Sequence, residues 1–143
     1  MQKTVGNVID EKGHDIWSID SARSVYEALE MMADKNVGAL VVYSGDAFSG
    51  IMSERDYARK VILVSKGSRK TPVSEIMTPD PVTVERADTV ASCMQLMTDK
   101  RIRHLPVIED GTLVGIISIG DVVRAVIEEQ KFLIDQLESY ITG

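Results

Sequence analysis

Residues 50–56 read Gly-Ile-Met-Ser-Glu-Arg-Asp and residues 115–121 read Gly-Ile-Ile-Ser-Ile-Gly-Asp, so the chain carries one seven-residue frame twice. The likeness extends outward, because residues 18–62 align with residues 83–127 without a gap and share 14 identities in 45 positions. An internal repeat of this kind predicts two similar structural units, here related by a pseudo-twofold axis. A repeat of about 65 residues is marginal for a core of its own, so we expect the halves to bury their apolar faces against each other as one body.

The apolar spacing predicts the same order of elements in both repeats. Apolar residues at i, i+3, i+4 and i+7 predict an amphipathic helix, and short valine-rich runs flanked by Gly-Asp or Asp-Gly pairs predict hairpin strands. The fold class that we expect is α+β, with two strand-helix-strand-strand-helix repeats. The expected strands cover residues 16–19, 39–43, 48–52, 82–84, 105–108 and 113–117, and the expected helices cover residues 24–35, 54–64, 90–97 and 119–140.

Polar stretches that contain glycine and proline divide the chain into four parts. We expect repeat one at residues 1–65, a linker at 66–72, repeat two at 73–127 and a C-terminal helix extension at 128–143. The linker is polar and contains glycine and proline. Each repeat is preceded by a leader, residues 5–17 and residues 73–82. In the second leader, Thr78-Pro79-Asp80-Pro81 is not expected to be helical, because each proline pushes the residue before it to extended geometry.

The last expected helix carries an apolar stripe that has two interpretations. The stripe packs on its own domain, or it forms a dimer contact, and the sequence does not choose between them. Its residues are Val122, Val126, Phe132, Leu133, Leu137 and Tyr140.

Bulk composition excludes several classes of function. The 143 residues carry a formal net charge of −6, which argues against a nucleic-acid backbone as the main partner. No apolar run approaches the length of a membrane span, so we expect no membrane partner. A single cysteine, Cys93, rules out an internal disulfide and, without a secretory signal, predicts a cytoplasmic protein. Cys93 lies on an apolar helix face and is expected to be an inert core residue.

The repeated Ser-x-x-Asp sequence has a structural and a functional interpretation. Ser53 with Asp56, and Ser118 with Asp121, have the spacing of a helix N-terminal capping box. The same strand-to-helix turn leaves backbone N–H groups that favour anions, and the glycine before it would let a ligand approach the backbone. A carboxylate at this place can accept the hydroxyls of a ribose. Spacing alone leaves both interpretations open.

The motifs taken together resemble the CBS domain, and the pair of repeats resembles a Bateman module. The resemblance spans about residues 5–127 and rests on Met77-Thr78-Pro79-x-Pro81-Val82-Thr83-Val84, on Arg103-His104-Leu105-Pro106-Val107 and on Gly115-Ile116-Ile117-Ser118-x-x-Asp121. Repeat one has the same frame in a looser form at residues 36–42 and 50–56. The resemblance implies regulatory binding of adenosine-containing ligands such as AMP, ADP, ATP, NAD or S-adenosylmethionine, in two clefts between the repeats.

The resemblance also implies a set of binding residues. The ribose would be held by Asp121 with Ser118 and by Asp56 with Ser53. The adenine would contact Ile116, Val37 and Trp17 at one site, and Ile51, Ile102 and Val82 at the other, with Thr78 and Thr83 nearby. Trp17 stays open between a core residue and a stacking partner of the base. Phosphates would meet Arg103 and His104, or Arg55 and, less directly, Arg59. Gly38 occupies in repeat one the position of Arg103, and Gly120 occupies in repeat two that of Arg55, so we expect the two clefts to differ in affinity for phosphorylated ligands.

Three classes of function follow from these expectations. The favoured one is a stand-alone nucleotide sensor that acts as a homodimer, or in trans on an unidentified protein. The alternative is a structural dimerisation scaffold with empty clefts. An enzyme is not expected, because the sequence has no Ser/His/Asp set, no metal cluster around its two histidines and no Walker-type phosphate loop.

Overall fold

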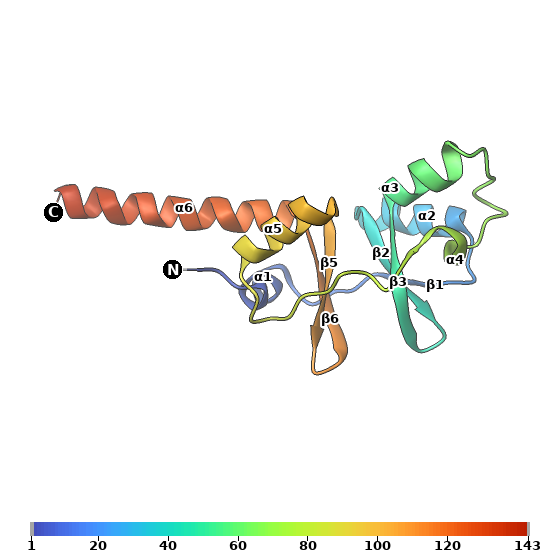
Figure 1. Cartoon of the computed structure of the whole chain (residues 1–143), viewed down its shortest axis with the longest axis horizontal. Helices are drawn as coiled ribbons and strands as arrows, with labels where there is room; N and C mark the ends of the chain where they lie inside the picture. The colour runs from blue at the N-terminus through green and yellow to red at the C-terminus, as the bar shows by residue number, and fades with distance from the viewer. Residues whose placement is uncertain (1, 143) are drawn as a thin grey trace. The chain divides into compact units, whose positions relative to one another are not determined.

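The chain, described for residues 2–142 in a computed structural model, forms two compact units (Figure 1). The repeat-one unit comprises residues 15–81. The repeat-two unit joins the chain up to His14 with the chain from Val82 onward. The two leaders are therefore exchanged relative to the order of the sequence, because residues up to His14 pack in the unit of repeat two and residues 73–81 pack in the unit of repeat one.

The repeat-one unit contains a four-stranded sheet in the order β1-β2-β3-β4. Strand β1 is parallel to β2, and the other two pairs are antiparallel. The strands are β1 (Ser18–Asp20), β2 (Ala39–Ser44), β3 (Ala47–Ser53) and β4 (Thr78–Pro79). The helices are α2 (Val25–Lys35), α3 (Glu54–Tyr57), which continues as a π-helical turn at Ala58–Ile62, and α4 (Val73–Ile76).

The repeat-two unit is built around an antiparallel hairpin of β5 (His104–Glu109) and β6 (Thr112–Ser118). Its helices are α1 (Val5–Lys12), α5 (Val90–Lys100) and α6 (Ile119–Thr142). A single parallel bridge joins Val84 to Val107, at the place that corresponds to the β1–β2 pairing of the other unit.

The structure confirms the expected α+β class, with both hairpins and the helices on either side of them. Three local features differ from the sequence prediction. The first leader forms helix α1, where no helix was predicted; the expected strand at residues 82–84 is reduced to the bridge at Val84; and the helix expected over residues 54–64 changes to π geometry at Ala58. The Thr78-Pro79 segment is extended, as its prolines require.

Helices α2 and α5 begin and end in the same way, which explains why the repeat is readable in the sequence. The side chains of Ser24 and Thr89 accept hydrogen bonds from the backbone N–H groups of Glu27 and Ser92. Each helix then ends at a residue in the left-handed region, Asn36 with φ 54° and Arg101 with φ 56°. The C-terminal residue differs, but the backbone conformation is the same.

Each unit has its own apolar core, which corrects the expectation of one shared core. In the repeat-one unit the cluster is formed by α2, β2, β3 and α4, with Leu40, Met52 and Ile76 fully buried. In the repeat-two unit Val5 and Ile9 of α1 join Leu105 and Ile117 of the hairpin and the buried face of α5. The exchanged leaders supply the apolar residues that a half-chain would lack.

The apolar stripe expected on the last helix divides into two parts. Val122 is buried and Val126 is partly buried against the core of their own unit. Phe132, Leu133, Leu137 and Tyr140 are exposed, so packing on the helix's own unit does not account for them. In Figure 1 the C-terminal half of α6 runs on past the other elements of its unit.

The paired glycines of the repeat lie under segments of the chain's own leaders. A Cβ added at Gly50 would lie 2.4 Å from the backbone oxygen of Thr78 in β4. A Cβ added at Gly115 would lie 2.7 Å from Cδ1 of Ile9 in α1. The space above each glycine is therefore filled by the protein, which corrects the interpretation that the glycine admits a ligand. Close approach of a leader is what requires glycine here.

These two glycines predict unequal costs for the same substitution. Gly50→Ala should lower the free energy of unfolding by about 2–3 kcal/mol, because backbone must move, whereas Gly115→Ala should cost less, because the end of the Ile9 side chain can change rotamer. Urea unfolding of both variants and the wild type measures the difference. Equal midpoints for Gly50→Ala and the wild type would show that β4 does not press on Gly50.

Candidate functional site

The repeat-one motif forms a complete capping box at the junction of β3 and α3. The Ser53 hydroxyl accepts a hydrogen bond from the backbone N–H of Asp56 at 3.2 Å, and Oδ2 of Asp56 accepts from the backbone N–H of Ser53 at 2.9 Å. Ser53 is both the last residue of the strand and the N-cap of the helix. The structural interpretation of the motif is therefore realised.

The repeat-two motif has the same geometry at the junction of β6 and α6. Oδ2 of Asp121 accepts from the backbone N–H of Ser118 at 2.8 Å, and the Ser118 hydroxyl accepts from the backbone N–H of Asp121 at 3.2 Å. The side chains of Asp56 and Asp121 are both only 12% exposed. Each unit thus holds one largely buried carboxylate at a strand-to-helix turn.

A lysine that sequence reasoning missed contacts each of these carboxylates. In the repeat-one unit, Lys60 Nζ lies 3.1 Å from Oδ1 of Asp56 and donates to the backbone oxygen of Ile76. In the repeat-two unit, Lys12 Nζ lies 2.7 Å from Oδ2 of Asp121 and donates to the backbone oxygen of Ile116. Lys60 follows Asp56 by four residues on one helix, a spacing that the sequence offers. Lys12 comes from the leader and has no such signal.

The Asp121 carboxyl shows how opposing effects set its charge. Burial on its own would raise its pKa, because it penalises the charged form. The hydrogen bond and charge of Lys12, together with the backbone N–H of Ser118, outweigh burial and hold the pKa of Asp121 below its ordinary value of 3.8. Asp121 is therefore an anion at neutral pH.

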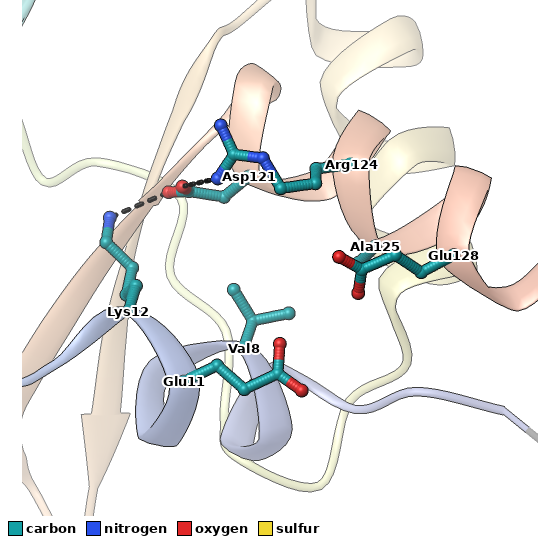
Figure 2. Close-up of a pocket in the computed structure, with 7 residues that line it drawn as sticks. All are labelled: Val8, Glu11, Lys12, Asp121, Arg124, Ala125 and Glu128. Atoms are coloured by element: carbon teal, nitrogen blue, oxygen red, sulfur yellow. Dashed lines mark hydrogen bonds and ion pairs between the residues drawn. The ribbon is translucent and has the colours of Figure 1, made fainter.

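A cavity of about 240 Å³ lies between α1 and the first turns of α6, within the repeat-two unit. Figure 2 shows Asp121 between Lys12 and Arg124 at one side of it, with the carboxylates of Glu11 and Glu128 farther along. Arg124 Nη1 lies 4.0 Å from Oδ1 of Asp121. The cavity is charged and is smaller than the roughly 300–1,000 Å³ of most small-molecule sites. Its volume suits a small polar group rather than a whole nucleotide.

The other expected binding residues of the repeat-one unit lie around its sheet. The carbonyl of Gly38 accepts from the backbone N–H of Glu54 at 3.0 Å, which places the start of β2 beside the start of α3. Ile51 is buried and is paired with Thr78 across β3 and β4. The remaining expected residues of this unit are Trp17, which precedes β1, Val37, which precedes β2, and Arg55 and Arg59, which follow Ser53.

The repeat-two unit brings its expected residues together in the same relation. The carbonyl of Arg103 accepts from the backbone N–H of Ile119 at 2.8 Å, and His104 is the register partner of Ser118. Two basic residues therefore stand beside the Ser118–Asp121 box, where the repeat-one unit has Gly38 and Ala39. The remaining expected residues of this unit are the exposed Val82 and Thr83 and the partly buried Ile102 and Ile116.

The structure also places Trp17 and Cys93. Trp17 is 37% exposed, so it is not a core residue, and Lys35 Nζ lies 4.5 Å from the centroid of its ring. Cys93 is buried, and burial raises the pKa of its thiol to about 11, in line with an inert core residue. Within residues 2–142, no group of three or more His, Cys, Asp or Glu side chains is arranged to hold a metal ion.

Comparison with known proteins assigns the family. The sequence profile of the CBS domain matches residues 6–63 and again residues 73–128. The chain therefore belongs to the CBS-domain family and carries two copies of the domain. CBS pairs are in general regulatory modules that bind adenosine-containing ligands, and the CBS-domain proteins to which this chain is similar are generally not enzymes.

The individual relatives are similar over most of the chain. The CBS domain-containing protein CBSX3, mitochondrial, of Arabidopsis thaliana is 43% identical over 98% of this chain and 72% of its own length. A structure of a putative signal-transduction protein with CBS domains from Burkholderia ambifaria MC40-6 is 45% identical, with a TM-score of 0.86 over 90% of this chain and 96% of the other. A hexameric CBS-CP12 protein from bloom-forming cyanobacteria is 28% identical, with a TM-score of 0.77 over 86% of this chain and 71% of the other.

Among residues 2–142, no helix has both the length and the apolar character needed to cross a membrane.

The contact between Lys12 and Asp121 predicts a measurable change in acidity. Lys12→Met should raise the pKa of Asp121, because burial then acts with less compensation. In the wild type, the lowered pKa stabilises the fold above pH 3.8, and that stabilisation is lost as the pH falls through the lowered pKa. Carboxyl ¹³C NMR titration of both proteins measures the pKa.

The matched control for this titration is Lys60→Met, which removes the lysine contact of Asp56 in the other unit. It should leave the pKa of Asp121 unchanged. An unchanged pKa of Asp121 in Lys12→Met would mean that the ion pair drawn in Figure 2 does not persist in solution.

Proposed function

We propose that this chain is a regulatory module that binds an adenosine-containing ligand at its Ser-x-x-Asp motifs and transmits binding through conformation or oligomerisation. AMP, ADP, ATP, NAD and S-adenosylmethionine share the adenosine part that such a motif would contact. The observation that carries the proposal is that both repeats have a largely buried carboxylate at the same strand-to-helix turn. In each repeat this carboxylate accepts a hydrogen bond from the backbone N–H of the serine that begins the helix. The regulatory role of CBS pairs in general supports it.

The ribose contact is proposed for the carboxylate oxygen that the fold engages least. In Asp121, Oδ2 already accepts from Ser118 and Lys12, whereas the contact at Oδ1 is the longer ion pair with Arg124. A carboxylate oxygen can accept more than one hydrogen bond, so Oδ1 has capacity for a ribose hydroxyl. Asp56 would act in the same way, with Lys60 on its Oδ1 exchanging for the ligand.

The remaining contacts are proposed from residue type. Apolar side chains would hold the adenine, hydroxyl groups would hold its polar edge or the ribose, and basic groups would hold any phosphate. With Asp121 and Ser118 we assign Ile116, Val37 and Trp17; with Asp56 and Ser53 we assign Ile51, Ile102, Val82, Thr78 and Thr83; for phosphate we assign Arg103, His104 and Arg55, with Gly38 as the uncharged counterpart of Arg103.

A ligand-free dimerisation scaffold is the second candidate function. It is favoured by the fact that Asp56 and Asp121 each have a lysine partner and a completed capping box. Both carboxylates are thus stabilised without any ligand. Binding measurements separate the two candidates.

The proposed sensor predicts that one adenosine ligand stabilises the wild type and fails to stabilise Asp56→Ala/Asp121→Ala. A ligand that binds only the native state raises the melting temperature by an amount set by its concentration relative to Kd. A panel of AMP, ADP, ATP, NAD, NADH and S-adenosylmethionine identifies the ligand. No shift with any of these would favour the scaffold, and turnover of a bound nucleotide would favour an enzyme.

Affinity measured below the melting temperature separates ribose contact from helix capping. Asp121→Ala should weaken binding at its site about 5- to 150-fold, the loss of a charge-assisted hydrogen bond of about 1–3 kcal/mol. The matched control is Thr89→Ala, which removes the N-cap of α5 in the same unit without touching the motif. Equal affinities for both variants and the wild type would leave Asp121 as a helix cap only.

The uneven distribution of basic residues predicts two unequal sites. Arg103 and His104 stand beside one motif and Gly38 and Ala39 beside the other, so titration with a phosphorylated ligand should give two different Kd values. Arg103→Ala should weaken binding of ATP more than binding of adenosine at the tighter site. Isothermal titration that fits two equal sites would contradict this asymmetry.

We also propose that the chain forms a homodimer in the cytoplasm. Assembly is supported by the hexameric state of the related CBS-CP12 protein. A protein partner regulated in trans would receive the output of such an assembly.

A further inference from the structure

Helix α6 is longer than its own unit can cover. It runs for 24 residues, from Ile119 to Thr142, and its buried residues are Val122 and Ala125. Every residue from Gln130 to Thr142 is exposed. A helical segment of this length is marginal in water without tertiary packing. The segment therefore needs a surface to pack on.

The exposed part of α6 carries one continuous apolar stripe. The positions recur every three or four residues, and at 3.6 residues per turn they fall within about 140° of arc. Seven of its residues are between 38% exposed, at Val123, and 87% exposed, at Tyr140, and Val126 is partly buried against the core of its unit. The stripe consists of Val123, Val126, Ile127, Leu133, Ile134, Leu137, Tyr140 and Ile141, with Gln130 as its one polar member. This sharpens the six-residue stripe of the sequence analysis, because Phe132 falls outside the arc.

The stripe has the spacing of a heptad seam. Val123, Gln130 and Leu137 are seven residues apart, as are Val126, Leu133 and Tyr140, and as are Ile127, Ile134 and Ile141. The first two series are the a and d positions of a coiled coil, and the third widens the seam on one side. Such a pattern packs against another helix rather than against a flat surface.

We propose that this stripe pairs with the same stripe of a second copy of the chain, with the two helices antiparallel. In that alignment Val123 lies opposite Tyr140, Val126 opposite Leu137 and Gln130 opposite Leu133, so every layer of the seam is filled from both sides. Because a two-fold axis relates the two copies, each of these three residue pairs occurs twice in the dimer. This inference rests on the homodimer proposed above and names the surface that forms it.

The residues that flank the seam favour the antiparallel arrangement over the parallel one. With Val123 at position a, the e positions are Ile127, Ile134 and Ile141, and the g positions include Glu129 and Gln136. In an antiparallel pair the e positions of the two copies face each other, so the isoleucines are buried together. In a parallel pair each e position faces a g position of the second copy, which would place the isoleucines beside Glu129 or Gln136.

The apolar area is sufficient for a stable contact. Seven of the stripe residues are large apolar side chains that are exposed in the single chain. At roughly 100 Å² for each, one stripe exposes on the order of 700 Å², close to the about 800 Å² per partner of a standard interface.

The test compares the mass of the wild type with that of Leu133→Asp/Leu137→Asp by sedimentation or light scattering. We expect a dimer for the wild type and a halved mass for the variant, because two carboxylates then lie in the seam. The matched control, Ser139→Asp/Thr142→Asp, adds the same charge to the other face of α6 and should stay dimeric. Far-UV circular dichroism of the whole chain checks that all three proteins are folded.

Cysteine cross-linking tests the orientation. A mixture of Val123→Cys and Tyr140→Cys proteins should give a covalent dimer on oxidation, whereas either protein alone should not. Native Cys93 is buried and its thiol has a pKa of about 11, so it does not compete.

Three outcomes would overturn the inference, and each bears on a different part of it: the homodimer, its interface or the orientation of the helices. A monomeric wild type removes the homodimer as well and means that another protein or another part of the chain covers α6. A dimer that survives Leu133→Asp/Leu137→Asp keeps the homodimer but places its interface elsewhere. Covalent dimers of a single cysteine variant with itself would show parallel helices.

Discussion

The reciprocal hydrogen bonds between the serine and the aspartate of each repeat are the constraint on which both units depend. Since Ser53 and Ser118 end a strand and also begin a helix, two hydrogen bonds fix the helix to the end of the hairpin. They also hold each carboxylate in one orientation, with one oxygen turned to the backbone. The position and charge of the candidate site follow from a local capping arrangement.

The exchanged leaders explain how two similar repeats acquired different chemistry. Both units place part of a leader over the paired glycine, but one uses the backbone of β4 and the other the side chain of Ile9 in α1. Because α1 is a helix, it also carries Lys12 to Asp121 and closes a cavity against α6. Strand β4 is too short to do the same, and Asp56 is paired with Lys60 from its own helix instead.

The parts of the structure that the sequence predicts are those whose determinants are local. Hairpins, caps and the amphipathic helices α2 and α5 follow from spacing within a few residues, and the capping geometry of Asp56 and Asp121 was among the stated interpretations. Helix α1 was missed although its signal is local, since Thr4 and Asn7 form a capping box and Val5, Val8 and Ile9 have helical spacing. The Lys12 contact was missed because it joins segments about 100 residues apart. Separate cores were missed because each core is completed by the leader that precedes the other repeat in the sequence.

The ion pairs already present at the two carboxylates determine what a ligand would gain there. A ribose hydroxyl at Oδ1 of Asp121 would displace Arg124 and so exchange an ion pair for a hydrogen bond from a neutral donor, so the hydroxyl alone gains little. A ligand that also carries phosphate offers Lys12 and Arg124 a new anionic partner, which offsets that loss. Lys60 is nearly half exposed and can turn to water at small cost. Binding at Asp56 therefore does not depend on a phosphate group to offset a lost ion pair. Selectivity for phosphate would therefore arise at Asp121, from the leader helix as well as from Arg103 and His104.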